Sequence, residues 1–295
     1  MNLALFRAFP NEHLFSLLLR LYKLSGYGDF ITFQKNVGIQ DRFLHANKVF
    51  SSTAEKLITH LEDRDETIKA HSVVPLWQMS VGQIIDVEDT RLQLFNHMNE
   101  QQLFGFDTSW HSCKKCRQDD LVTYGTSYWH AKHQLPSVFE CYKHHCTLDK
   151  GVEPVKNLFT EILPHQVVAW NPVLSRISGD LKCWQSFVWK IDAISHNQPS
   201  TVADIKHRLI ELLGLNIQSL PKRKAICELH NPHFESALGP VLIKYIFRDY
   251  TRSTQRGKTN ILSSMFANIH KAQGVRNPIY WVALAYWQRA KLGLN

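Results

Sequence analysis

The sequence predicts a mainly α-helical protein in which a small metal-binding module separates two helical regions. Apolar residues recur every three or four positions in several segments of both halves, which is the period of an amphipathic helix. Between these segments, two pairs of Cys and His side chains interrupt the periodic pattern. We therefore expect a helical domain over residues 1–110, a metal module over 111–150 and a second, basic helical domain over 151–295.

The composition of the 295 residues is that of a globular chain. Hydrophobic residues make up 44%, the mean hydropathy is −0.25, and no apolar run approaches the roughly 20 residues that a bilayer span requires. The segment from Met1 to Pro10 lacks the basic start and the long apolar stretch of a signal peptide. We expect a bacterial cytoplasmic location, where the six Cys residues are reduced thiols or metal ligands.

The first expected helix covers residues 11–25. Asn11 is a good capping residue, Leu side chains repeat at helical spacing along one face, and Gly26 ends the pattern. Arg20 and Lys23 are expected on the other face.

Two further helices are expected before the metal module. One begins at Ser52, where Glu55 completes the spacing of a capping box, and the other covers residues 86–98.

The metal module rests on two spaced pairs of side chains. Cys113 and Cys116 are followed, after twenty-four residues, by Cys141 and His144. Two intervening residues let both members of a pair reach one ion from a tight turn. Four protein ligands complete the tetrahedral coordination of Zn²⁺, so we expect a closed, structural zinc site that stabilises a module with little core of its own.

Two alternatives remain open for these residues. His145 or Cys146 can replace His144 as the fourth ligand, since both follow it directly. The Cys residues can also be ordinary reduced thiols, although a CxxC followed by a CxxH, with further His residues nearby, disfavours that interpretation.

Positive charge is concentrated in the last third of the chain. Residues 206–295 hold fourteen Lys and Arg against four Asp and Glu, a local excess of +10, whereas the remaining residues carry −2 of the net charge of +8. Such a division indicates a polyanion as partner of this region, and we expect double-stranded DNA.

The same region has the outline of a helix-turn-helix, although a plain helical hairpin has that outline too. Thr201 is expected to cap a helix that ends at Gly214, and Pro221 starts a basic helix after a short turn. Arg and Lys interleaved with Ser, Thr and Gln further on fit phosphate contacts. The expected DNA-binding residues are Lys222, Arg223, Lys224, Arg252, Arg256 and Lys258.

Three more helices are expected at 234–250, 261–271 and 278–291. Trp281 and Trp287 in the last one are interpreted as core residues rather than as a platform for stacking bases.

The module contains, in this order, Tyr128-Trp-His130, His133-Gln-Leu-Pro136 and Cys141-x-x-His144-x-x-x-Leu148. Taken together, these motifs resemble the TniQ/TnsD family, the target-selection proteins of transposons that carry a separate AAA+ regulator. The N-terminal segment from Pro10 to Tyr27 is similar to the family's opening helix. The resemblance covers residues 10–150 well and the second half loosely.

The resemblance implies a non-enzymatic, DNA-binding factor that selects the insertion site and recruits an AAA+ regulator and a transposase. Family members bind a fixed attachment site or dock on an RNA-guided CRISPR effector, and the sequence does not decide between these modes or exclude a homodimer. The zinc module is expected to fix the geometry between the two helical regions. This chain is shorter than the attachment-site readers, and Cys146, Cys183 and Cys227 cannot build a second four-ligand site.

Two other functional classes of protein are alternatives to a target-selection factor. A zinc-dependent nuclease or hydrolase would use the His-rich segment at 130–146, but His130-x-x-His133 is not the HExxH pattern of a zinc protease. A zinc-containing transcription regulator would bind DNA as a dimer. The chain also lacks a GxxxxGK[ST] phosphate-binding loop.

Overall fold

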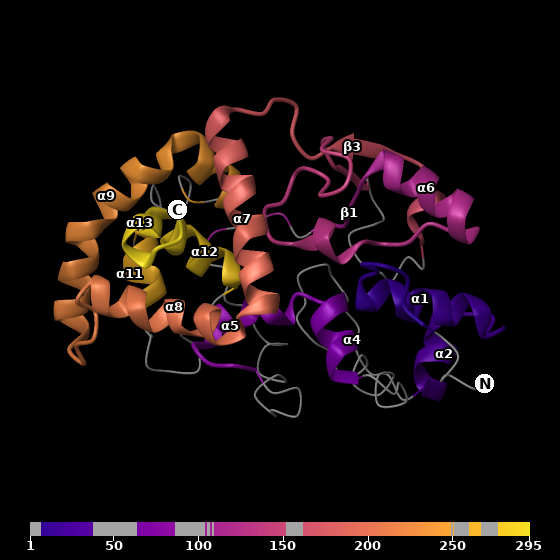
Figure 1. Ribbon diagram of the computed structural model, residues 1–295, viewed down its shortest axis with the longest axis horizontal. Helices are drawn as coiled ribbons and strands as arrows, with labels where there is room; N and C mark the ends of the chain where they lie inside the picture. Colours follow the sequence, from indigo (N-terminus) through magenta and orange to yellow (C-terminus); the bar gives the residue numbers. More distant parts are fainter. Residues whose placement is uncertain are drawn as a thin grey trace. The chain divides into compact units, whose positions relative to one another are not determined.

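The computed structural model describes residues 7–37, 64–85, 104, 107, 109–151, 162–248, 250, 260–266 and 277–295 (Figure 1). Within them the chain is mainly helical with one three-stranded antiparallel sheet, as the sequence predicts. The described residues form two compact units. The first comprises those up to 74 and those from 109 to 177, and the second comprises those from 75 to 107 and from 178 onward. None of the described helices is both long and apolar enough to cross a membrane.

The helices α1 (Leu14–Leu24), α2 (Phe30–Val37) and α4 (Arg64–His71) belong to the first unit. The expected cap of α1 is wrong, because His13 rather than Asn11 occupies the N-cap position and its Nδ1 accepts from the N–H of Phe15 at 3.1 Å. Asn11 instead adopts a left-handed conformation with φ 57°. The helices expected from Ser52 and over 86–98 lie outside the described residues.

The remaining elements of the first unit surround the predicted metal module. They are β1 (His111–Ser112), α6 (Lys114–Tyr124), the 3₁₀ helix η3 (Ala131–Gln134), β2 (Asp149–Gly151), the 3₁₀ helix η5 (Pro164–Gln166) and β3 (Trp170–Pro172). The strand order is β1-β2-β3, so β2 pairs with both neighbours. In the register, Lys150 lies opposite His111 on one side and Asn171 on the other. Short strands of this kind have little stability on their own.

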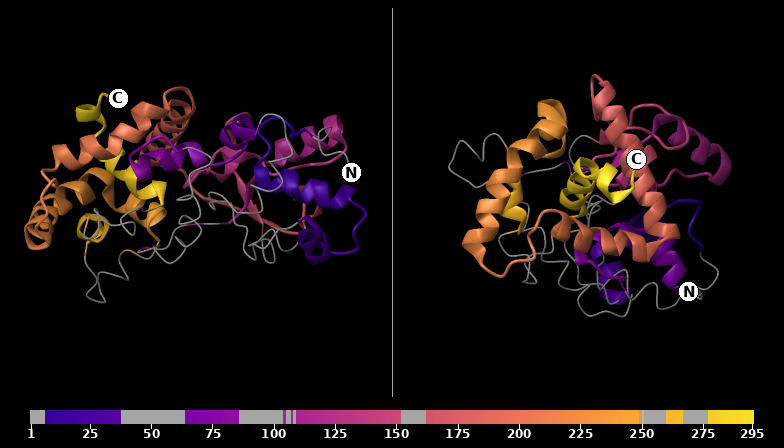
Figure 2. Two further views of the ribbon diagram at one scale, coloured as in Figure 1. Left: turned by 90° about the horizontal axis from the view of Figure 1, so that it is seen from below. Right: turned by 60° about the vertical axis from the view of Figure 1, so that its left-hand side comes forward.

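The N-terminal segment pairs directly with the module. The backbone N–H of His13 donates to the carbonyl of Trp129 at 2.7 Å, and the N–H of Ala131 donates to the carbonyl of Asn11 at 2.7 Å. The hydroxyl of Ser16 accepts from the N–H of Trp129 at 3.0 Å. The views in Figures 1 and 2 agree in showing α1 beside the module. The module and α1 are therefore parts of one packed body.

A buried ion pair fixes this junction. Arg20 does not face away from the core as expected, because its guanidinium donates to both carboxylate oxygens of Glu12 at 2.7 Å each. The Glu12 carboxylate is fully buried and also accepts from the N–H of Phe9 at 3.0 Å. The Arg20 guanidinium lies 3.6 Å from the centre of the Phe9 ring. This pair ties the start of the chain to α1.

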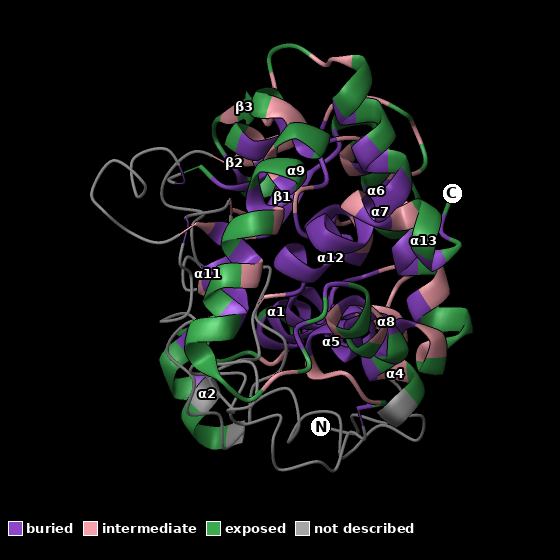
Figure 3. Ribbon diagram, turned by 90° about the vertical axis from the view of Figure 1, so that its left-hand side faces the viewer, coloured by how far each residue is buried: buried purple, intermediate pink, exposed green. Residues whose placement is uncertain are grey.

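The second unit is a bundle of helices. They are α5 (Val74–Val81), α7 (Gly179–Asn197), α8 (Pro199–Leu212), α9 (Leu220–Ile246), α11 (Ile261–Phe266), α12 (Pro278–Trp287) and α13 (Arg289–Leu292). Helices α11 and α12 both pack against α9. Helix α12 is buried on nearly all sides (Figure 3), as expected for a helix that is apolar around its whole circumference.

The structure corrects several sequence-based boundaries in this unit. Helix α8 begins at Pro199, so Thr201 lies inside it rather than at the cap. The helices expected near 221 and over 234–250 form one element, α9, which is kinked at Gly239 where φ is 72°. Helix α7 has no counterpart in the expected elements. Its Trp184 and Ile191 are buried.

The two C-terminal Trp residues differ in exposure. Trp281 is fully buried, which confirms its interpretation as a core residue, whereas Trp287 is half-buried. Lys206 lies beside Trp281, with Nζ 5.1 Å from the ring centre, and donates to the carbonyl of Ser80 at 2.7 Å. Burial lowers the pKa of Lys206 to about 8.

We expect Arg20→Ala to lower the free energy of unfolding by about 3–5 kcal/mol, because it leaves the buried Glu12 carboxylate without its cationic partner. Urea denaturation measures the change. Lys23→Ala is the matched control, since Lys23 is an exposed cation on the same helix and its removal should change stability by about 0.5 kcal/mol or less. Equal effects of the two substitutions would contradict a stabilising role for this ion pair.

Candidate metal centre

The first pair of predicted ligands lies at the start of α6. Cys113 is the N-cap residue, with extended backbone angles of φ −95° and ψ 131°, and Cys116 lies in the first helical turn. The sequence analysis expects a tight turn for this pair, which is wrong for Cys116 because this residue is helical. Both side chains are buried. A helix fixes Cys116 relative to the backbone more tightly than a loop would, since helical dihedrals are fixed by the backbone hydrogen bonds.

The second pair lies on a tight turn between Cys141 and Cys146. The N–H of Cys141 donates to the carbonyl of Cys146 at 2.8 Å, and the N–H of His145 donates back to the carbonyl of Cys141 at 3.0 Å. His145 takes the left-handed conformation that closes the turn, with φ 49°. The N–H groups of Lys143 and His144 lie 3.4 and 3.3 Å from the Cys141 sulfur. The pKa of the Cys141 thiol is nevertheless raised, chiefly by its hydrogen bond with Cys113, because the two N–H donors lower it by less.

The four predicted ligand atoms converge. The sulfurs of Cys113, Cys116 and Cys141 and a ring nitrogen of His144 all lie within 4.8 Å of one another. Nδ1 of His144 is 3.4, 3.3 and 3.7 Å from the sulfurs of Cys113, Cys116 and Cys141 respectively. The sulfurs of Cys116 and Cys141 are 3.7 Å apart.

These distances fit a tetrahedral zinc site. With Zn–S near 2.3 Å and Zn–N near 2.05 Å, the edges of a tetrahedron are about 3.8 Å between two sulfurs and about 3.6 Å between sulfur and nitrogen. Three thiolates and one imidazole are also a donor set that zinc accepts in closed structural sites. The cluster can therefore hold a metal ion with four protein ligands and no open position.

The alternative fourth ligands fit less well. The His145 side chain is 69% exposed, and its Nδ1 lies 3.5 Å from a Glu140 carboxylate oxygen. The Cys146 sulfur is 3.4 Å from that of Cys113, but it does not belong to the set of four mutually close donors. Burial, followed by the hydrogen bond with Cys113, raises the pKa of the Cys146 thiol to about 11. The geometry therefore favours His144.

Asp119, which the sequence did not single out, orients the His144 ring. Its Oδ2 lies 3.1 Å from Nε2 of His144, and this leaves Nδ1 facing the three sulfurs. The same oxygen accepts from Nζ of Lys143 at 2.7 Å. The hydrogen bond from Lys143 is the main reason why the pKa of Asp119 is lowered. A carboxylate behind a ligating His fixes the tautomer and the orientation of the ring.

A second group of His residues borders the cluster. His130, His133 and Cys116 have ligand atoms within 4.8 Å of one another. Both nitrogens of His130 already have partners, since Nε2 lies 3.0 Å from Asp120 Oδ2 and Nδ1 lies 3.1 Å from the Tyr142 hydroxyl.

His133 lies nearer the sulfurs, with Nε2 3.4 Å from the sulfur of Cys141. Its pKa is lowered, first by burial and then by His130, so the ring is neutral. These two His residues thus support the cluster rather than form a separate site.

The predicted DNA-binding residues do not share one environment. Lys222 and Lys224 are exposed near the start of α9. Arg223 between them is buried. Its guanidinium donates to the carbonyls of Ile217 and Gln218 and so stabilises the turn that precedes α9. The remaining three, Arg252, Arg256 and Lys258, lie outside the described residues.

The first unit is thus a helical domain built around a cluster of three Cys and one His that could hold a metal ion. Residues 5–148 match the family model TniQ, and they include all four candidate ligands and α1. The resemblance to the TniQ family is confirmed over residues 5–148, which form a TniQ domain. At the level of the family, this indicates a role in target selection associated with transposition. Comparisons with curated proteins and with solved structures gave no match.

We expect the purified chain to contain about one equivalent of Zn²⁺, with an X-ray absorption spectrum of three sulfur ligands and one nitrogen ligand. Cys116→Ser should abolish stoichiometric zinc and unfold the first unit, because the ion would join the start of α6 to the turn that carries Cys141 and His144. The matched control is Cys183→Ser, which removes an exposed thiol in α7. A chain that keeps its circular dichroism spectrum without bound metal would refute the site.

We expect Asp119→Asn to weaken zinc affinity by about tenfold to a hundredfold, because the His144 ring loses the carboxylate that orients it. Competition with a chromogenic chelator measures the affinity. Lys143→Met is the control, since it removes the exposed ion pair with Asp119 and leaves the His144 contact in place. If both substitutions weaken binding equally, the ion pair rather than the orientation of the ring is responsible.

Proposed function

We propose that this protein is a non-enzymatic, DNA-binding target-selection factor for transposition, with Zn²⁺ as its structural metal. The observation that carries the proposal is the closed cluster of Cys113, Cys116, Cys141 and His144 inside the matched domain. The ion fixes the module against which α1 packs, so the domain presents one rigid surface. We propose that it acts in the bacterial cytoplasm, where thiols stay reduced.

The proposed partners are those of the family. The factor recruits an AAA+ regulator, and through it the transposase, to the insertion site. The site is recognised either by binding an attachment sequence in double-stranded DNA or by docking on an RNA-guided CRISPR effector. An adjacent ATPase gene and an integrase-type transposase gene in the genome would support this assignment, and a gene neighbourhood without them would weaken it.

The DNA contacts are assigned to the second unit. We propose α8, the turn after it and α9 as a helix-turn-helix, in which Lys222 and Lys224 contact phosphates from the start of the second helix. Arg223 is omitted from the phosphate contacts because it is buried against the turn. Arg252, Arg256 and Lys258 remain proposed contacts on the strength of the sequence. Homodimerisation would allow two such units to bind related half-sites.

The alternatives have less support. A zinc-dependent nuclease or hydrolase needs an open coordination position for water, whereas four protein ligands converge in this cluster. A zinc-containing transcription regulator requires the same DNA contacts but no AAA+ partner. Co-purification with the ATPase would favour the transposition factor, and a palindromic footprint without it would favour the regulator.

We expect log affinity for duplex DNA to fall linearly with log salt, with a slope of about −0.9 per phosphate contact. Lys222→Ala with Lys224→Ala should make the slope shallower by roughly one to two units, and so should the joint replacement of Arg252, Arg256 and Lys258. Fluorescence anisotropy over a salt series measures the slope. Lys182→Ala, an exposed cation on α7, is the control. A flat dependence for the unaltered chain would rule out a phosphate-binding role.

A further inference from the structure

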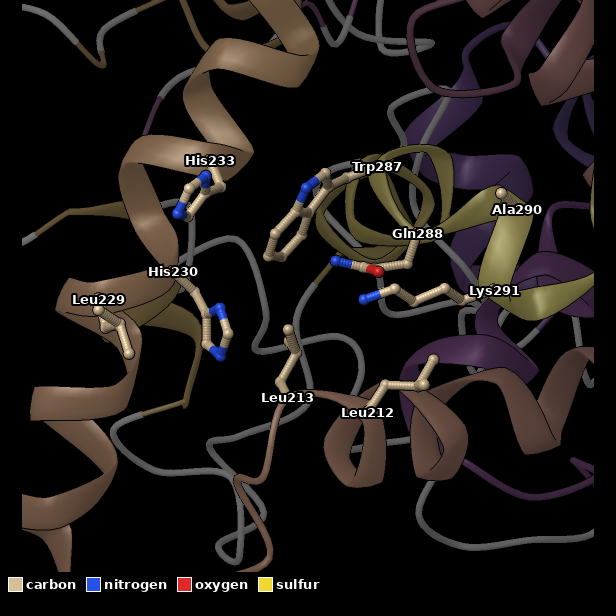
Figure 4. Close-up of a pocket in the computed structure, with 9 residues that line it drawn as sticks. All are labelled: Leu212, Leu213, Leu229, His230, His233, Trp287, Gln288, Ala290 and Lys291. Atoms are coloured by element: carbon tan, nitrogen blue, oxygen red, sulfur yellow. The ribbon is translucent and has the colours of Figure 1, made fainter.

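The second unit contains a cavity of about 510 Å³ that the proposed function does not use (Figure 4). Its walls come from the end of α8, the middle of α9 and the segment where α12 gives way to α13. The volume falls in the range of sites that accept small molecules or single side chains. It is therefore large enough for an anchor residue of a partner.

One side of the cavity is apolar. Leu212, Leu213 and Leu229 line it together with the half-buried ring of Trp287. Leu229 is 69% exposed and Leu212 is 41% exposed, so apolar surface faces solvent next to the cavity. The Trp287 ring is held in place by edge-on contacts with Phe234 and His230, whose ring centres are 5.5 and 6.2 Å away. A fixed aromatic ring beside exposed Leu side chains is typical of sites that bind an apolar anchor.

The other side of the cavity is basic. Figure 4 shows His230 and His233 on successive turns of α9, with Lys291 across from them. The pKa of His230 is lowered, first by burial and then by the charges of His233 and Lys291. Like-signed groups therefore gather here without a carboxylate among the lining residues. Glu211 and Glu228 adjoin lining residues in sequence, but neither lines the cavity.

The basic side extends along α9. Lys222 precedes His230 by eight residues and His233 by eleven, so the three lie on one face of the helix. Lys222 is exposed. An occupant whose apolar side chain enters the cavity would meet positive charge on its adjoining residues.

We propose that this cavity binds an acidic peptide segment of a partner protein, with a Leu or an aromatic residue as anchor and Asp or Glu residues beside it. The anchor packs against Trp287 and Leu229, and the carboxylates face Lys291 and the His pair. This assigns a protein-binding site to the second unit, where the proposed function assigns DNA contacts. Lys222 belongs to both surfaces, but none of the described residues that line the cavity is a proposed DNA contact.

A peptide fits the walls better than a nucleic acid does. Phosphate sites are built mainly from Arg, Lys and backbone N–H groups, whereas Lys291 is the sole Lys or Arg among the nine described lining residues. Solvent-facing Leu side chains are better matched by an apolar anchor than by a sugar-phosphate chain.

The test selects short random peptides, displayed on phage, against the immobilised full chain. The expected result is enrichment of sequences that place Leu, Phe or Trp next to Asp or Glu. Calorimetry then compares a synthetic peptide of the enriched sequence on the unaltered chain and on variants. Leu229→Glu and Lys291→Glu should each weaken binding about tenfold or more.

Val241→Glu is the matched control, since Val241 is 51% exposed on the same helix and does not line the cavity, and it should leave the affinity unchanged. Each of three results would overturn the proposal. They are no enrichment of acidic sequences, equal loss of affinity in the Val241→Glu control, and displacement of the peptide by a single-stranded oligonucleotide whose binding also needs Leu229. The last result would assign the cavity to nucleic acid.

Discussion

The first unit depends on the convergence of four donor atoms from two distant turns. Three thiolates this close together would repel one another unless a cation lay between them. The pKa of Cys116 is raised and that of Cys113 is lowered, in both cases chiefly by the hydrogen bond between their sulfurs, so the thiols share protons instead of ionising together. A divalent ion would offset this repulsion, because it stabilises all three sulfurs as thiolates. The cluster is therefore the point at which the fold of the first unit is most sensitive to its environment.

The segment between the two ligand pairs links the cluster to the N-terminal helix α1. Residues 128–132 lie inside the loop that the cluster closes, and their backbone pairs with Asn11 and His13. The Trp129 ring packs near those of Trp110 and Trp170 in the same unit. Closing the loop therefore also holds the segment that receives α1, and the buried pair of Glu12 and Arg20 secures the other side of that junction.

The sequence predicts features within one short segment well, but it predicts contacts between residues far apart in the chain poorly. The convergence of Cys113, Cys116, Cys141 and His144 could be predicted because each two-residue spacing brings two side chains to the same side of one short segment. The cap of α1 was missed because Asn11 uses its side chain to accept from the N–H of Lys132, far along the chain. Asp119 was missed although it follows Cys116 by three residues and so shares its helix face. Its partner His144 lies in a different segment, and the pattern of a single helix does not show which residues of another segment it contacts.

Charge counted along the sequence also differs from charge available at the surface. Two cations in the basic third, Lys206 and Arg223, are buried and donate hydrogen bonds to backbone carbonyl groups. Lys222 and Lys224 are exposed near the start of α9, and Lys222 lies in the first turn, where a cation opposes the helix dipole at a cost of about 0.3–1 kcal/mol. Neither has an acidic partner among the described residues that would offset this cost. An external anion at the start of α9 would do so, which is a physical reason to assign phosphate contacts to these two residues.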